Sequence, residues 1–212
     1  MSGHHLPIKS SKEIKDFFER NNGQQFIEHF PLPSFRWAEG GLNRLNYFHL
    51  NDVFNRKTKL GAKLINTCLK MQKFLGIKRK PLNTFPKLYG GSAWWSLSSS
   101  CVRHAINEID KDPSFLKRLK HTLCPEEVLF QTILMNSHYK HSIIGNNTLT
   151  LMLWEYRNGN SPANLDKSDF PMILKSTKLF ARRFEYPTSQ SLVELIKKDV
   201  NQKEVLDDSC FG

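Results

Sequence analysis

A proline followed by two acids, directly before an apolar segment, places the strongest local constraint on this chain. The tetrapeptide is Cys124-Pro125-Glu126-Glu127, and residues 128–134 continue it as Val-Leu-Phe-Gln-Thr-Ile-Leu. Proline is favoured at the first helical position, and acids in the first turn are stabilised by the helix dipole. The pattern therefore predicts a helix over residues 125–137, with two carboxylates at its start that the dipole helps to keep ionised.

Two interpretations of these carboxylates are open at this point. An ionised carboxylate held rigidly at a helix N-terminus is suited to act as a general base that deprotonates a substrate hydroxyl. Acids also occupy the first turn of helices that have no chemical role, because the dipole alone favours them there. The four residues do not separate a catalytic acid from a helix-capping one.

Local signals predict the rest of the secondary structure. Ser10 followed by Glu13 forms a capping box, and the chain breaks near Gly23, Gly76 and Pro81. Helices are expected over residues 10–20, 98–109, 114–121, 168–174 and 189–200, and in the first part of the segment 56–80. Strands are expected over residues 24–30, 47–53, 88–92 and 149–156. Mixed strands and helices without internal repeats predict an α/β fold, with one domain over residues 1–200 and a polar, frayed tail over 201–212.

Composition excludes several classes of protein. No apolar run approaches the roughly 18 residues of a membrane-spanning helix, and the N-terminus lacks the apolar core of a signal peptide. The four cysteines, Cys68, Cys101, Cys124 and Cys210, lie far apart without a CxxC pair. This spacing argues against a zinc site or a disulfide scaffold, and it favours free thiols in a reducing compartment.

The net charge of +11 is concentrated in one segment. Between Arg56 and Lys80 the chain carries nine Lys or Arg residues and no acid. Such a segment is either a solvated basic helix or a surface for anionic lipid, nucleic acid or phosphorylated substrates. No pattern typical of a nucleic-acid-binding module accompanies it. We therefore expect no nucleic acid partner, and the functional interpretation is a peripheral contact with an anionic membrane.

Four motifs, in this order, resemble one enzyme family. The chain is similar to the core-2/I-branching β-1,6-N-acetylglucosaminyltransferases, a family that also contains the peptide O-xylosyltransferases. The resemblance extends from Ser2 to about Ile196 and rests on Ser2-Gly3-His4-His5-Leu6-Pro7-Ile8-Lys9, Gly91-Ser92-Ala93-Trp94-Trp95, Cys124-Pro125-Glu126-Glu127 and Leu179-Phe180-Ala181-Arg182-Arg183-Phe184.

The resemblance implies a GT-A-like fold and an inverting glycosyltransferase. The donor would be a UDP-sugar carrying N-acetylglucosamine or xylose, and the acceptor a glycan or peptide hydroxyl. The family lacks a metal-binding DxD motif, so neither a metal nor another cofactor is expected. Asp110-Lys111-Asp112 matches DxD by letter, but it follows a predicted helix instead of an apolar strand.

The resemblance also implies roles for individual residues. Glu127 matches the general base, which leaves Glu126 as a neighbour, while Arg183 with Arg182 would hold the donor diphosphate. Trp154, Tyr156 and Glu28 match acceptor-binding residues. Two alternatives stay open: the arginines could form an ordinary solvated turn, and the aromatic rings could pack in a core. Arg157 is a candidate for a second basic contact with the diphosphate.

The matched motifs correspond to the C-terminal two-thirds of such an enzyme, in a compact version of bacterial type. The nucleotide-binding half of the family would precede Met1, so we expect a GT-A-like fold truncated at its N-terminus and weak or no activity from the 212 residues alone. Animal members are Golgi membrane proteins, whereas this sequence predicts a cytoplasmic location or the cytoplasmic face of a membrane. The alternatives are a non-catalytic carbohydrate-binding remnant and a basic membrane-associating protein.

Overall fold

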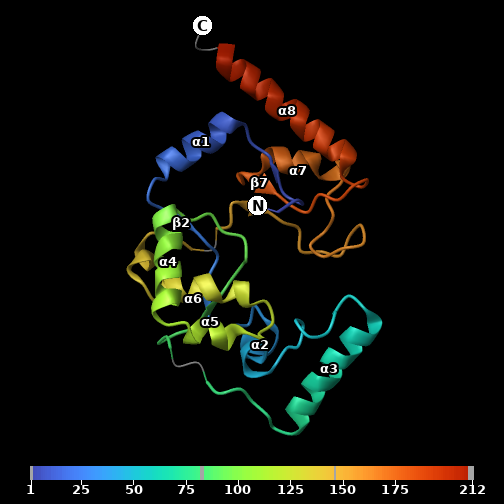
Figure 1. Cartoon of the computed structure of the whole chain (residues 1–212). Coiled ribbons are helices and arrows are strands. Elements are labelled where there is room, and N and C mark those ends of the chain that lie inside the picture. The colour runs from blue at the N-terminus through green and yellow to red at the C-terminus, as the bar shows by residue number, and fades with distance from the viewer. Residues whose placement is uncertain (1, 82–83, 146, 210–212) are drawn as a thin grey trace. The chain divides into compact units, whose positions relative to one another are not determined.

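The chain folds into two compact units in a computed structural model, which describes residues 2–81, 84–145 and 147–209 (Figure 1). Unit 1 comprises Met1–Gln24 and Thr148–Gly212, and unit 2 is the continuous segment Gln25–Asn147. Each unit has its own buried apolar cluster. The expected mixture of helices and strands is confirmed, with small sheets; a single domain over residues 1–200 stays a prediction.

Unit 1 is built on a three-stranded sheet whose central strand comes from the C-terminal part of the chain. β7 (Phe180–Ala181) pairs antiparallel with β1 (Leu6–Pro7) and parallel with β6 (Thr150–Leu151). The other elements are α1 (Ser11–Arg20), η4 (Lys167–Asp169), α7 (Phe170–Lys175) and α8 (Gln190–Ser209). Its buried cluster consists of Ile8, Leu165, Ile173, Ala181, Phe184, Leu192 and Ile196.

Unit 2 contains two two-stranded sheets and most of the helices. β2 (Gln25–Phe26) pairs parallel with β5 (Ile143–Ile144), and β3 (Phe30–Pro31) pairs antiparallel with β4 (Tyr89–Gly90). The helices are η1 (Ala38–Gly41), α2 (Leu42–Asn46), α3 (Lys59–Phe74), α4 (Ser99–Lys111), α5 (Ser114–Leu119), η2 (Pro125–Glu127), α6 (Leu129–Met135) and η3 (His138–His141). Its buried cluster includes Ile27, Phe30, Leu45, Phe115, Leu119, Val128, Ile133 and Leu134.

Helices with clear terminal signals are confirmed. Ser10 Oγ accepts a hydrogen bond from Glu13 N at 3.2 Å, and Glu13 Oε2 accepts one from Ser10 N at 2.8 Å, so the capping box of α1 is complete. Ser98 caps α4 by a single bond, in which its Oγ accepts from Cys101 N at 3.3 Å. The last helix is longer than predicted, because α8 continues to Ser209 through most of the expected frayed tail; residues 210–212 lie outside the described residues.

The predicted strands are mostly wrong in length. Residues 24–30 and 149–156 each contribute only two-residue strands, and residues 47–53 form no strand. In that last segment the backbone bonds are turn-like, because Val53 N and Phe54 N both donate to Leu50 O, while His49 N donates to His121 O. A local turn uses the groups that a neighbouring strand would need.

The predicted helix over residues 125–137 is divided. Val128 has φ −125°, which separates the 3-10 turn η2 from α6. Cys124 enters η2 in the left-handed region, at φ 51°. The two acids therefore lie in a separate turn before a seven-residue helix, and not in the first turn of a long one.

Candidate active site

Glu127 is the last residue of η2, and its backbone is fixed on both sides. Its N–H donates to Cys124 O at 3.1 Å, and its carbonyl accepts from Gly91 N at 2.9 Å. The side chain keeps 26% of its surface exposed. This is a carboxylate on a rigid backbone that solvent or a substrate can reach.

Arg44 of α2 holds the Glu127 carboxylate. Its Nη1 donates to Glu127 Oε2 at 2.5 Å, and only 19% of the arginine side chain is exposed. The Arg44 Cζ atom lies 3.8 Å from the centroid of the Trp37 ring, in a cation–π contact. Trp37 itself packs edge-to-face on Phe30 of β3 at 5.0 Å. The guanidinium is thereby fixed between an aromatic ring and the carboxylate.

The environment of Glu127 raises its pKa. Burial is the largest cause, and the charges of Glu126 and Glu28 act in the same direction, whereas the hydrogen bond and the charge of Arg44 lower it. The sequence predicted that a helix dipole would help to keep this carboxylate ionised; instead its pKa is raised, with burial as the largest cause. A carboxylate with a raised pKa is a stronger proton acceptor once ionised, as general-base catalysis requires.

Gly91 brings the backbones of Glu28 and Glu127 together. A Cβ atom at this position would lie 1.9 Å from Glu28 O, so the position has no space for a side chain. Since Gly91 N also donates to Glu127 O, one residue contacts both predicted site residues of unit 2. The close approach of these two backbones therefore requires a glycine at position 91.

Glu28 is paired with an arginine that the sequence did not single out. Arg36 Nη1 donates to Glu28 Oε1 at 3.1 Å, and the Arg36 Cζ lies 5.1 Å from the Phe30 ring centroid. Arg36 also forms part of the wall of a cavity of about 580 Å³, which is otherwise lined by His29, Phe30, Pro31, Pro33, Ser34, Phe35, Lys87 and Tyr89. Sequence reasoning missed Arg36, Arg44 and Trp37 because no local pattern marks them.

The predicted donor residues Arg182 and Arg183 follow β7 in unit 1. Arg183 Nη2 donates to Glu185 Oε2 at 2.6 Å, and both arginine side chains are half-buried. The antiparallel pairing of β1 with β7 brings the loop containing His4 and His5 to this strand. His4 Nδ1 lies 3.1 Å from Phe184 O and 3.4 Å from Glu185 Oε2.

This cluster carries a net positive charge at neutral pH. Burial and the nearby charge of Arg182 lower the pKa of His5 to about 4, so its imidazole is neutral. Burial and the charge of Arg183 also lower the pKa of Arg182, which still leaves an arginine protonated at neutral pH. Of the two consecutive half-buried arginines, Arg183 is paired with the Glu185 carboxylate, and the role of both in holding an anion stays a prediction.

Trp154 and Tyr156 do not lie on a strand. β6 ends at Leu151, so the alternation that would place both rings on one face of a strand does not apply. Their exposed fractions are 72% and 79%, which shows that the core-packing alternative is wrong. The two rings are available to solvent in unit 1, and their acceptor role stays a prediction.

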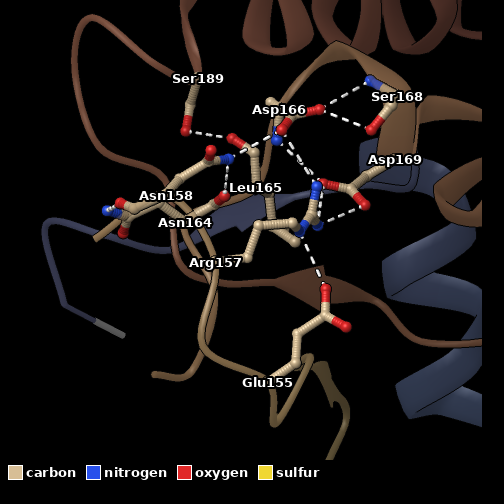
Figure 2. Close-up of polar contacts among 9 residues, drawn as sticks. All are labelled: Glu155, Arg157, Asn158, Asn164, Leu165, Asp166, Ser168, Asp169 and Ser189. Atoms are coloured by element: carbon tan, nitrogen blue, oxygen red, sulfur yellow. Dashed lines mark hydrogen bonds and ion pairs between the residues drawn. The ribbon is translucent and has the colours of Figure 1, made fainter. Parts of the chain in front are cut away.

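Arg157 is not available to hold a diphosphate, and that prediction is wrong. Its guanidinium contacts three carboxylates: Glu155 at 2.8 Å, Asp166 at 3.0 Å and Asp169 at 2.7 Å (Figure 2). Asp169 is buried. The residue therefore has a structural role in the loop that precedes η4.

Metal-binding geometry is absent from residues 2–81, 84–145 and 147–209, in which no group of three or more His, Cys, Asp or Glu side chains could hold a metal ion. Asp110 lies in the last turn of α4, and Asp112 Oδ1 accepts from Ser114 N at 2.9 Å, in a helix-linking turn.

Cys68, Cys101 and Cys124 are free thiols, while Cys210 lies outside the described residues. None of the helices in the described part of the chain is long and apolar enough to span a membrane.

The sequence profile of the Core-2/I-Branching enzyme family matches residues 1–173. The chain belongs to this family. The match includes Glu28, Glu127, Trp154 and Tyr156, and it ends before Arg182. Family membership places the chain among the glycosyltransferases.

Three curated relatives show how low the sequence identity within the family is. Xylosyltransferase oxt of Drosophila pseudoobscura pseudoobscura is 24% identical over 207 residues, covering 89% of this chain and 21% of the relative. Xylosyltransferase 2 of Rattus norvegicus is 25% identical and that of Homo sapiens is 24% identical, each over 213 residues, covering 92% of this chain and 22% of the relative. The family member described here thus spans about a fifth of the length of these relatives.

Proposed function

We propose that this chain contributes the catalytic base and part of both substrate sites of an inverting, metal-independent glycosyltransferase with a GT-A-like fold. The enzyme would transfer N-acetylglucosamine or xylose from a UDP-sugar to a glycan or peptide hydroxyl. The observation that carries the proposal is the half-buried Glu127, whose pKa is raised by burial while Arg44 holds it at 2.5 Å. The names of the curated relatives support xylose as a donor sugar.

Glu127 would act in a single displacement. As the acceptor oxygen attacks the anomeric carbon, its proton passes to the Glu127 carboxylate, and the bond from that carbon to the UDP oxygen breaks with its electron pair. Arg183 and Arg182 would stabilise the charge that develops on the departing diphosphate. In this proposal the two arginines take the place of the metal that other enzymes use to stabilise the diphosphate.

The acceptor would be held by a carboxylate and by aromatic rings. Glu28 is a hydrogen-bond acceptor in the unit that contains Glu127, and its pairing with Arg36 fixes its orientation. Trp154 and Tyr156 present exposed rings on which the C–H face of a sugar can stack. The proposal includes a peripheral contact of residues 56–80 with an anionic membrane surface. It includes no nucleic acid partner.

The test is Glu127→Gln in the full-length protein that contains this chain. We expect transfer from UDP-N-acetylglucosamine or UDP-xylose to fall by about 10²–10⁴-fold, because a general base is lost. UDP affinity, measured by calorimetry, should stay unchanged. Glu126→Gln is the matched control and should keep transfer within a few-fold of the parent. Unchanged turnover in Glu127→Gln would remove this residue from the mechanism.

A second candidate function is carbohydrate binding without chemistry. The specific observation in its favour is the exposure of both Trp154 and Tyr156. Sugar binding that is lost in Trp154→Ala and Tyr156→Ala, with neither transfer nor hydrolysis of any UDP-sugar by the full-length protein, would favour this candidate over the enzyme.

A further inference from the structure

The outer surface of α3 carries an exposed apolar stripe. Leu60 and Phe74 keep 68% and 89% of their surfaces exposed, and Leu64, Met71 and Leu75 are also exposed. At about 100° per residue, Leu60, Leu64 and Met71 lie within about 40° of each other around the helix axis. The stripe therefore runs along α3, with the exposed Thr67 between Leu64 and Met71; Figure 1 draws this helix in teal.

Lysines form a second stripe beside the first. Lys59, Lys63 and Lys70 are exposed, and their centre lies about 100° around the axis from the centre of the apolar stripe. Each is a cation next to apolar surface. No acid occurs between Arg56 and Lys80, so no residue of this segment neutralises them.

One side of α3 packs against the rest of unit 2, and this packing keeps the opposite, outer side of the helix exposed. Gly61 and Ile65 are buried, and a Cβ at Gly61 would lie 2.1 Å from Asn55 O. Gln72 and Phe48 exchange two hydrogen bonds, from Phe48 N to Gln72 Oε1 at 2.8 Å and from Gln72 Nε2 to Phe48 O at 3.0 Å. The helix therefore cannot turn its apolar stripe inward.

Two of the basic residues in the segment belong to the structure of unit 2 instead. Arg79 is half-buried, donates to the carbonyls of Arg118 and Lys120, and lies over the Phe48 ring at 4.8 Å. Lys73 pairs with Glu39 at 2.7 Å. The charge offered to a partner thus comes from the other basic residues, Arg56, Lys57, Lys59, Lys63, Lys70, Lys78 and Lys80.

We propose that the outer surface of α3 is a docking surface for an anionic lipid bilayer. An apolar stripe bordered by lysines on one helix is the arrangement of interfacial helices, which insert apolar side chains among acyl chains while cations meet the headgroups. A second copy of this chain would bring two lysine stripes of the same sign together, and nucleic acid would leave the apolar stripe in water. This proposal rests on the membrane contact proposed above and specifies the helix surface that makes it. Because the surface needs no step of glycosyl transfer, a negative result here would leave the proposed enzyme activity untouched, and loss of transfer in Glu127→Gln would leave this proposal untouched.

Vesicle flotation with the 212-residue chain tests the proposal. We expect binding to vesicles of phosphatidylcholine with phosphatidylglycerol, little binding to phosphatidylcholine alone, and a steep loss at high salt because surface charges are screened. Equal binding to both vesicle types, or binding to neither, would overturn the proposal. So would salt-dependent binding to DNA that exceeds binding to the anionic vesicles.

Two pairs of variants separate the contributions of charge and apolar surface. Lys63→Gln with Lys70→Gln should weaken vesicle binding roughly thirtyfold, at about 1 kcal/mol for each lysine. Lys197→Gln with Lys198→Gln, which removes equal charge from α8, should change it less than threefold.

Leu60→Ser with Phe74→Ser should weaken binding by at least tenfold, whereas Ile106→Ser with Leu116→Ser, at exposed apolar positions of α4 and α5, should not. Circular dichroism should show unchanged helix content in all four variants. Losses of similar size in test and control variants would contradict the proposal, as would sedimentation showing a dimer that Leu60→Ser with Phe74→Ser dissociates.

Discussion

Arg44 Nη1 lies 2.5 Å from Glu127 Oε2, and the same guanidinium stacks on Trp37 at 3.8 Å. The two paired residues are 83 positions apart in the sequence. Their contact joins α2 to η2, so the orientation of the candidate base depends on a helix that carries none of the predicted site residues. Arg44 is in this sense a positioning residue, and its effect should be visible in the pH dependence of activity.

Arg44→Gln should move the acidic limb of the pH profile to higher pH. Arg44 lowers the pKa of Glu127 against the effect of burial. Without it the pKa rises further, and a base is active only when ionised, so kcat/KM should fall about tenfold or more on the acidic side and recover as the pH rises. Arg44→Lys retains the charge and should keep most of the parent profile. An unshifted limb in Arg44→Gln would show that the pair does not tune Glu127.

Gly91→Ala should destabilise the protein by about 1–3 kcal/mol, because a Cβ at 1.9 Å from Glu28 O forces the backbone apart. Urea unfolding measures the change in the free energy of unfolding. Gly3→Ala is the matched control, since a Cβ at Gly3 meets nothing within 4 Å, and its effect should stay within about 0.5 kcal/mol. Equal stability of the two variants would contradict the close approach at Gly91.

Arg183→Ala and Glu185→Gln should change UDP affinity in opposite directions. Loss of a guanidinium that meets a diphosphate should weaken binding by roughly tenfold to a hundredfold. Loss of the Glu185 charge releases Arg183 from its 2.6 Å partner and should tighten binding modestly, more so at low salt. Calorimetry with the full-length protein measures both. Unchanged affinity in Arg183→Ala would exclude this residue from the donor site.

Arg157→Ala should destabilise the protein by about 3 kcal/mol, because it leaves the buried Asp169 carboxylate without its bidentate partner. Asp169→Asn in the same chain removes the uncompensated charge and should restore part of the loss. Arg103→Ala, at an exposed position of α4, serves as the control. The three variants are compared by urea unfolding, and equal effects of Arg157→Ala and Arg103→Ala would count against the network in Figure 2.

Features determined by neighbouring residues were predictable from the sequence. The Ser10–Glu13 capping box, the Ser98 cap and the extent of α3 all depend on bonds within one helix and its ends. The left-handed Gly76 after α3 belongs to the same class. In each case a few consecutive side chains decide where the helix begins or ends.

Features that depend on distant residues were not predictable in the same manner. Thr150 and Leu151 form a strand only because Phe180 and Ala181 lie beside them, and no local pattern shows that the pairing stops before Trp154. In the sequence nothing distinguishes Arg157 from a cation available to a diphosphate, because its three carboxylate contacts are seen only in the structure. The family resemblance identified Glu127 as the candidate base. Only the structure shows that Arg44 pairs with it and that burial raises the pKa of Glu127.

The pairing of Leu6 with Ala181 has a consequence for the order of biosynthesis. Unit 2 lies in one stretch, Gln25–Asn147, so all of it is translated before the strand that completes unit 1, β7. Since compact segments generally fold as they emerge, the Glu127–Arg44 pair can form while Leu6 and Ile8 still await their partners. Newly made chains would therefore pass through a stage in which the apolar side chains of Leu6 and Ile8 are without their partners, and this is the stage at which a chaperone would bind.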